Sequence, residues 1–362
     1  MNKLAISILL LIASVVFSFS QKPAPPPESP LKKCWTSTVD SAEVRAMLSD
    51  AATLYAATSD GKLRAVRSDD GSQLWTAEIG GDFVSNMIMA NDDLVVISNT
   101  SGEKKLSVVR SLSRQTGVVH WRAQVPFSEK YYLGGLERDE ISAVGSSGFA
   151  IGVSIENGTT IWKTDLGEVS AAPSFRNGKV LVGSVSKRIY SISTAERGRV
   201  LLSVESKWKP TAVALHDEGD FVVGDERGNI AKYDSNGNTG WKFKNGASIS
   251  YLLGIEGGIL AASNDNFLYM LTNSRGGVIW KRRLSGRIAL EPVVMKESIF
   301  AVTYGDGRGY SVSMRKGKII DQILNSEKDF TPVTIAGFGE KLIVPGPNGI
   351  TQYSANCKIS GL

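Results

Sequence analysis

Few of the 362 residues are of the types that usually carry out catalysis. The chain has two histidines, His120 and His216, which are too far apart in the sequence for the closely spaced pair typical of a zinc site. Neither the Gly-x-Ser-x-Gly nucleophile elbow nor the Gly-x-x-x-x-Gly-Lys-Ser/Thr phosphate loop occurs in the sequence. The acidic turns at 217–220 and 264–266 lack the spacing of a calcium loop. The sequence therefore predicts a protein without a catalytic residue, a metal site or a bound cofactor.

The composition is that of a globular protein. Apolar residues make up 42% of the chain and charged residues 21%, which excludes a disordered chain, a collagen and a coiled coil. The 41 Lys and Arg outnumber the 36 Asp and Glu, and the net charge of +5 is spread along the sequence. A nucleic-acid-binding protein would concentrate its basic residues on one face, so we expect no nucleic-acid partner.

The N-terminus has the pattern of an export signal. Lys3 precedes an apolar run over 4–17, and Ser18 and Ser20 stand at the −3 and −1 positions of a cleavage site. We expect residues 1–20 to be a cleaved signal peptide, with an uncleaved anchor as the alternative. Residues 21–33 hold five prolines and are predicted to form an extended linker. No cysteine directly follows the apolar run, so we predict a periplasmic or secreted protein that is not a lipoprotein and has no transmembrane segment after cleavage.

The remaining chain repeats with a period near 40 residues. Each repeat has a short apolar strand, a turn, a second strand and then a glycine, which is followed four residues later by a large residue. This marker is a Trp in five repeats, at Trp75, Trp121, Trp162, Trp241 and Trp280. Leu202 and Asp321 take its place in two others, and Trp35 lies 40 residues before Trp75 and begins the series. Because the Trps recur in one register, we expect them to pack between neighbouring repeats rather than to bind a ligand.

Four short strands in each repeat of this length predict a β-propeller. The eight marker positions predict an all-β, eight-bladed ring with four antiparallel strands in each blade, formed by residues 34–362 as one domain. The residues after Asp321 hold only three strands of the pattern, and the strand around Trp35 supplies the fourth. We therefore expect the N-terminal strand to close the ring. An open solenoid is the alternative, but it would not explain why the missing strand lies at the other end of the chain.

The two cysteines fall on opposite sides of this closure. In the repeat that ends at Trp241, Gly237 lies in the last turn and Gly240 precedes the Trp. The same register in the split blade puts Cys357 at the Gly237 position and Cys34 at the Gly240 position. We predict a disulfide between Cys34 and Cys357, which the oxidising compartment outside the cytoplasm permits. Two unrelated buried thiols are the alternative.

The repeat resembles a known propeller family. Residues 59–63 with 70–75, and residues 156–162, are similar to the strand, Asp-Gly, strand and Thr-Gly-x-x-x-Trp consensus of the quinoprotein-like, or PQQ-type, repeat. In length and export signal the chain looks like the periplasmic BamB-type propellers, which help to assemble outer-membrane proteins, although those are typically lipoproteins. The resemblance implies a monomeric, non-enzymatic scaffold that binds protein partners in the cell envelope.

Two other functions stay open. A sensor propeller would capture a small molecule or a saccharide in its central funnel, and an acidic and aromatic cluster there would favour it. A PQQ-dependent dehydrogenase is the weaker alternative, because such enzymes are longer and typically carry two adjacent cysteines, whereas Cys34 and Cys357 are 323 positions apart.

Three sets of residues are candidates for partner binding. Trp208 is out of register with the repeat and lies beside basic residues. A connector with aromatic residues follows the second blade, and a basic segment follows the sixth repeat Trp. These two sets are Phe127, Tyr131 and Tyr132, and Lys281, Arg282 and Arg283. For the basic set, a solvated outer edge that discourages strand pairing is the alternative.

Overall fold

The computed structural model describes residues 30–38, 42–216, 219–305, 307–324, 332–346 and 349–357. The predicted signal peptide, most of the proposed linker and the last five residues lie outside these ranges. In the described ranges every regular element is a β-strand, and no helix there is long and apolar enough to cross a membrane.

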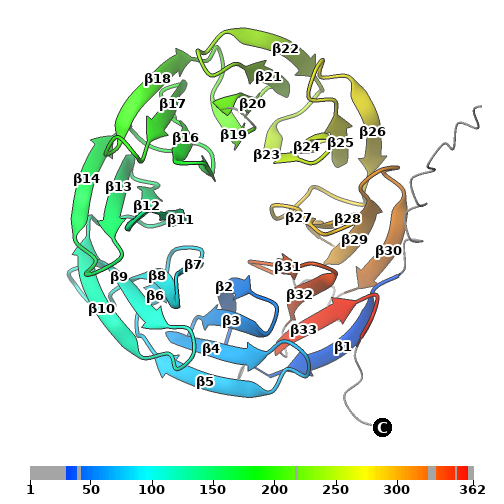
Figure 1. Cartoon of the computed structure of the whole chain (residues 1–362). Coiled ribbons are helices and arrows are strands. Elements are labelled where there is room, and N and C mark those ends of the chain that lie inside the picture. The colour runs from blue at the N-terminus through cyan, green and yellow to red at the C-terminus, as the bar shows by residue number, and fades with distance from the viewer. Residues whose placement is uncertain are drawn as a thin grey trace, which may run out of the picture.

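The strands form eight sheets arranged as the blades of a ring (Figure 1). Each blade runs from an innermost strand near the centre to an outermost strand at the rim. Blades 1–4 contain β2 (Val44–Ser49), β3 (Thr53–Thr58), β4 (Lys62–Arg67) and β5 (Gln73–Glu78); β6 (Asp82–Phe83), β7 (Ile88–Ala90), β8 (Asp93–Asn99), β9 (Ser107–Ser113) and β10 (Val119–Val125); β11 (Tyr131–Glu137), β12 (Glu140–Gly145), β13 (Phe149–Ser154) and β14 (Thr160–Asp165); and β15 (Ser174–Arg176), β16 (Lys179–Gly183), β17 (Arg188–Ser193) and β18 (Arg199–Glu205).

Blades 5–8 continue the ring in the same order. They contain β19 (Pro210–Leu215), β20 (Phe221–Asp225), β21 (Asn229–Tyr233) and β22 (Thr239–Lys244); β23 (Ile249–Ile255), β24 (Gly258–Ser263), β25 (Phe267–Leu271) and β26 (Val278–Arg283); β27 (Val293–Val294), β28 (Ser298–Val302), β29 (Arg308–Ser313) and β30 (Ile319–Leu324); and β31 (Ala336–Phe338), β32 (Lys341–Gly346), β33 (Gly349–Ser354) and β1 (Lys32–Ser37). The eight-bladed propeller predicted from the repeat is confirmed.

Blade 8 closes the ring with strands from both ends of the chain. The N-terminal β1 pairs antiparallel with β33, so that Trp35 lies opposite Gln352 and Thr36 lies opposite Thr351 (Figure 1). The predicted closure is therefore confirmed. It satisfies the backbone groups of β33, which would otherwise form an unpaired sheet edge.

The hydrophobic core lies between the blades. The middle strands are buried on both faces, as in β3, where five of six residues are buried, whereas the outermost strands alternate between more and less exposed residues. One cluster, for example, joins Val95 and Ile97 of blade 2 to Ile141 and Ile151 of blade 3. Because each cluster draws on two blades, a single blade has no core of its own, and the ring must assemble as a whole.

Blade 2 departs from the four-stranded plan. Its innermost strand is divided into β6 and β7, which both pair with β8. The residues between them turn toward blade 3, where the Val84 carbonyl accepts a 2.7 Å hydrogen bond from the Tyr131 N–H. The Asn86 side chain also bonds the Leu133 backbone, accepting from its N–H at 2.7 Å and donating to its carbonyl at 3.0 Å. The interruption thus ties the innermost strands of two blades together.

Candidate functional site

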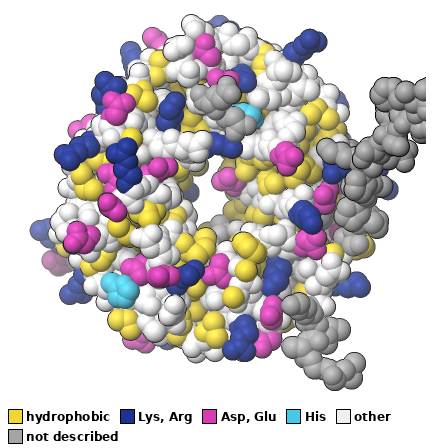
Figure 2. All heavy atoms as spheres, viewed as in Figure 1, with side chains coloured by type: hydrophobic (Ala, Val, Ile, Leu, Met, Phe, Trp, Pro, Cys, Tyr) yellow, Lys and Arg dark blue, Asp and Glu magenta, His cyan; other side chains and the backbone are white. Residues whose placement is uncertain are grey.

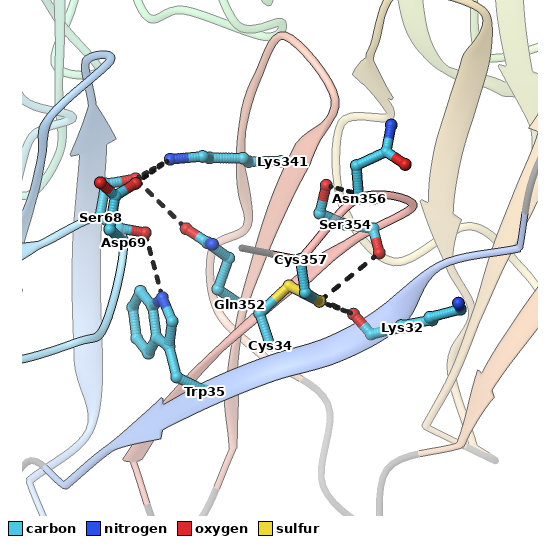
Figure 3. The surroundings of a disulfide bond; sticks show 10 residues. All are labelled: Lys32, Cys34, Trp35, Ser68, Asp69, Lys341, Gln352, Ser354, Asn356 and Cys357. Atoms are coloured by element: carbon cyan, nitrogen blue, oxygen red, sulfur yellow. Dashed lines mark hydrogen bonds and ion pairs between the residues drawn. A yellow bond between two sulfur atoms is a disulfide. The ribbon is translucent and has the colours of Figure 1, made fainter. Parts of the chain in front are cut away.

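The ring closure carries the disulfide expected from the repeat register. Cys34 in β1 and Cys357 just after β33 are bonded, with their Cα atoms 5.3 Å apart (Figure 3). Nearby, Trp35 Nε1 donates to the Ser68 carbonyl at 3.1 Å, and Lys341 Nζ donates to Ser68 Oγ at 3.0 Å. Blade 8 is thus held to blade 1 by polar contacts as well as by packing, and the cysteines are structural.

The repeat Trps pack between blades. Trp75, Trp121, Trp241 and Trp280 each donate their Nε1–H to a backbone carbonyl of the next blade, at 2.7 to 3.0 Å. Trp162 differs, because it donates to Glu140 Oε1 of its own blade at 3.0 Å. The rings contact glycines of the next blade that lie four residues before its marker position. These marker glycines adopt positive φ angles. These interactions engage the indoles within the ring and make them part of the scaffold.

The aromatic connector after blade 2 is only partly available to a partner. Tyr131 was expected in a loop, but it is the first residue of β11, is fully buried and donates its hydroxyl hydrogen to the Pro126 carbonyl. This part of the expectation was wrong, because Tyr131 fills the core between blades 2 and 3. Phe127 is 38% exposed, and Tyr132 is half-buried with Lys130 Nζ 4.9 Å from its ring centroid.

The basic residues of β26 do not form one patch. Successive side chains of a strand point to opposite faces, and Arg282 points away from its two neighbours. Its Nε donates to the Gly317 carbonyl of blade 7 at 2.5 Å. Lys281 and Arg283 are exposed on the other face, where Lys281 Nζ lies 5.7 Å from the centroid of the Phe267 ring. On the face shown in Figure 2, basic and acidic side chains are interspersed around the ring.

A groove lies at the boundary between blades 4 and 5, and we call it the Trp208 groove. Its volume is about 920 Å³, against about 230 Å³ for a cavity lined by innermost strands. Trp208 belongs to the connector from β18 to β19 and forms part of the rim. Val223, Ala231 and Lys242 are cross-strand partners in β20, β21 and β22, so they share the face that lines the groove. Val223 packs with Leu181 of blade 4, which places this face toward blade 4.

Four exposed basic side chains surround the groove, and we call them the groove cations. They are Lys207, Arg227, Lys242 and Lys244. The Trp208 ring lies between two of them, with Lys207 Nζ at 5.6 Å and Arg227 Cζ at 5.0 Å from its centroid. Such distances allow cation–π attraction, which orders the rim. Sequence reasoning singled out Trp208, but it did not show that Lys242 and Lys244 of β22 lie beside it.

The central channel holds a second group of polar and aromatic residues. Figure 2 shows an opening at the centre of the ring with hydrophobic side chains on its wall. Phe175, Tyr251 and Glu291 line a cavity of about 230 Å³ there. The Glu291 side chain is open to the channel but has protein around it on its other sides. The surrounding protein partly desolvates the carboxyl group, which raises its pKa. Burial, together with neighbouring groups that include Glu291, raises the pKa of Tyr251 to about 12.

Sequence reasoning did not find Glu291. Its position directly before Pro292, at the start of an innermost strand, is the sequence feature that could have pointed to it. The Glu291 carboxylate forms no hydrogen bond or ion pair within the described part of the chain. An unpaired carboxylate among aromatic rings can attract a cation or accept hydrogen bonds from hydroxyl groups.

Comparisons with known proteins agree with the fold. By structure the chain is similar to BamB from Moraxella catarrhalis, with a TM-score of 0.69 and 18% sequence identity over 89% of this chain and 97% of that one. It is also similar to the computationally designed Ika8 protein (TM-score 0.75, 14% identity, 89% and 99% covered) and to the C-terminal WD40 domain of Sif2 (TM-score 0.70, 10% identity, 91% and 99% covered). At these identities the likeness shows the fold alone.

Sequence comparison identifies the family more closely. A comparison with curated protein sequences found no match. The family model described as outer membrane protein assembly factor BamB matches residues 32–227 and 226–351, which is nearly the whole propeller. The repeat consensus, the eight blades and this match agree, and the chain belongs to the BamB family of β-propellers.

Proposed function

We propose that this protein is an exported, non-enzymatic scaffold that binds other proteins during the assembly of outer-membrane proteins. The observation that carries the proposal is the match of residues 32–351 to the BamB family model. The disulfide supports export, because such bonds persist in the periplasm and outside the cell. The rigid ring supports a binding role, since loops held on a stable scaffold are where binding sites usually form.

The processing of the N-terminus is part of this proposal. Residues 1–20 direct export and are removed, residues 21–33 form a linker, and residues 34–362 form one monomeric propeller. Intact-mass analysis of the protein purified from the periplasm tests this directly. We expect a chain that begins at Gln21, and a mass that includes Met1 would show that the apolar segment is retained as an anchor.

The assembly role is tested by deletion in the native host. We expect the mutant to contain fewer β-barrel proteins per unit of outer membrane, measured by quantitative mass spectrometry of purified membranes. Expression of the wild-type chain should restore them. Unchanged β-barrel levels in the deletion mutant would contradict an assembly role.

A second function is favoured by one observation, the unpaired Glu291 carboxylate beside Tyr251 and Phe175 in the central channel. These residues form the acidic and aromatic cluster expected of a propeller that captures a small molecule or a saccharide. Glucosamine and N-acetylglucosamine are a matched pair of probes, because only glucosamine carries an ammonium group. Calorimetry should show that glucosamine binds more tightly and that Glu291→Gln removes the difference. Absence of binding of both sugars would exclude this site as an amino-sugar receptor.

A further inference from the structure

Two blade boundaries lack the repeat Trp, and they are filled differently. At the boundary between blades 7 and 8, Asp321 takes the Trp position, and its Oδ2 accepts a 2.8 Å hydrogen bond from the backbone N–H of Leu31. The Leu31 side chain joins the apolar cluster that includes Ile323 and Tyr353. A chain segment from outside the repeats therefore supplies an apolar group at this boundary.

At the boundary between blades 4 and 5, Leu202 takes the Trp position. A Cβ added to the marker glycine, Gly237, would stand 3.0 Å from Val204 and 3.2 Å from Leu202. At Gly276, where Trp241 occupies the same place, the corresponding distance to the indole is 2.3 Å. The packing at Gly237 is therefore looser, and the Trp208 groove lies along this boundary.

One wall of the groove follows a single β-strand. Asn229, Ala231 and Tyr233 occupy alternate positions of β21, and all three line the groove. Four residue steps along a strand span about 13 Å. The wall can therefore accommodate about four residues of an extended peptide. The Tyr233 ring, stacked on Phe221 with centroids 5.0 Å apart, provides an apolar surface at one end.

The charge of the groove selects the partner. None of the groove cations has a carboxylate within ion-pair distance among the described residues. The two acidic residues of the lining have other partners, one inside the groove and one outside it. Asp225 accepts hydrogen bonds from Asn229 at 2.7 and 3.0 Å, and Glu226 Oε2 lies 3.9 Å from Lys209 Nζ. The four groove cations outnumber these two carboxylates, so the groove presents net positive charge around a Trp and a partly apolar wall.

We propose that the Trp208 groove binds an extended acidic peptide segment of a partner protein. One apolar side chain of that segment packs against Ala231 and Tyr233, and its carboxylates pair with the groove cations. This proposal rests on the proposed scaffold function and adds the chemistry of the segment that the scaffold recognises. A peptide is favoured over an anionic polysaccharide because the groove combines its charge with a wall of strand length, on which Ala231 and Tyr233 offer apolar contacts.

The test measures binding of a fluorescein-labelled octapeptide in which Asp and Glu flank a central Leu-Phe pair. The protein is the oxidised mature chain, and fluorescence anisotropy is recorded at physiological salt. We expect saturable binding, and we expect the double substitution Lys242→Glu with Lys244→Glu to weaken it at least tenfold. Trp208→Ala should weaken it several-fold. Unchanged binding by these variants, or no binding by the wild-type protein, would overturn the proposal.

Blade 6 provides a matched control. Lys281 and Arg283 occupy the same register as Lys242 and Lys244, but their boundary is filled by Trp241. The double substitution Lys281→Glu with Arg283→Glu changes the net charge equally, and we expect it to alter the affinity by less than twofold. An equal loss in both double variants would show that net charge alone attracts the peptide, which contradicts a site in the groove.

Two further probes separate the alternatives. A peptide with Ser in place of the Leu-Phe pair should bind at least fivefold more weakly, whereas equally tight binding of dextran sulfate would indicate a general polyanion surface and overturn the peptide proposal. In the native host, the Lys242→Glu, Lys244→Glu variant should fail to restore β-barrel levels in the deletion mutant. Full restoration by this variant would show that the Trp208 groove is not needed for partner binding, and it would leave the proposed assembly role unaffected.

Discussion

The indole of Trp75 in blade 1 packs directly on Gly117 in blade 2, where a Cβ would stand 2.6 Å from a ring carbon. Gly117 also has a φ of +73°, in the left-handed region that favours glycine. The same pairing of an indole with a left-handed glycine recurs around the ring and fixes the spacing of neighbouring blades. Each such contact joins residues 35 to 42 positions apart in the sequence, with Trp75 and Gly117 the most widely separated pair.

Gly117→Ala should therefore destabilise the ring through both the backbone and the packing. We expect a loss of about 2–4 kcal/mol in the free energy of unfolding, from left-handed strain and from overpacking against the indole. Gly80→Ala is the control, because Gly80 has a φ of +74° but no atom within 4 Å of the added Cβ. It should lose only about 1–2 kcal/mol. Denaturant titrations followed by Trp fluorescence measure both, and equal losses would show that the indole contact contributes nothing.

Removal of the disulfide should weaken the ring closure. The bond between Cys34 and Cys357 encloses 323 positions of sequence, and the chain-entropy model assigns such a loop a stabilisation on the order of 5 kcal/mol before strain. We expect the double substitution of both cysteines by Ser to lower the melting temperature and to make β1 the first segment cut by protease. Mass spectrometry of the unreduced wild-type protein should detect no free thiol. Detection of two free thiols, or an unchanged melting temperature in the variant, would contradict this role.

Glu291 should destabilise the folded protein at neutral pH. Desolvation raises the pKa of this carboxyl group above its ordinary value of 4.5, so folding favours the protonated form. The cost is absent below pH 4.5 and appears as the pH rises through the raised value. Glu291→Gln should therefore raise the melting temperature at pH 7 and leave it nearly unchanged at pH 4. Glu129→Gln, in an exposed connector, is the control and should have little effect at either pH. A Glu291→Gln variant that melts below the wild type at pH 7 would refute the argument.

Asp60 should contribute stability that is lost in acid. Its Oδ2 lies 2.8 Å from Nη2 of the buried Arg64, and these hydrogen bonds lower the pKa of the Asp60 carboxyl well below its ordinary value of 3.8. The stabilisation is present above that ordinary value and declines as the pH falls below it. We expect Asp60→Asn to cost about 1–3 kcal/mol at pH 7, because the buried Arg64 loses its charged hydrogen bonds to Asp60, and to reduce the acid sensitivity of the protein.

Asp92→Asn is the control for this pair. The Asp92 carboxylate is 81% exposed and lies 3.1 Å from Arg114, so its loss should cost about 0–1 kcal/mol. Thermal melts at pH 7 and at pH 3 measure both variants. If Asp60→Asn and Asp92→Asn behave alike at pH 7, the burial of Arg64 has no energetic consequence.

The architecture can be predicted from the sequence, because the pattern that specifies a propeller is local and repeated. The Gly-to-Trp spacing, from Gly71 and Trp75 to Gly276 and Trp280, counts the blades without reference to any contact between them. The same register placed Cys34 and Cys357 across the closure, since each residue has a defined position within its own blade. Because the blades repeat, the register of one complete blade predicts the positions of residues in the blade that is split between the two ends of the chain.

The positions of the exposed and functional groups could not be predicted in this way, because they depend on packing between blades. The sequence around Tyr131 is typical of a loop, yet its N–H bonds Val84 in the divided innermost strand of blade 2 and its side chain is buried in the core. Lys242 joined Trp208 in one groove because β22 and the connector after β18 meet only when blades 4 and 5 stack. Glu291 and Tyr251 line one cavity because the innermost strands of blades 6 and 7 come together only when these blades stack. Distances between blades are absent from a local repeat, and so these sites required the folded ring.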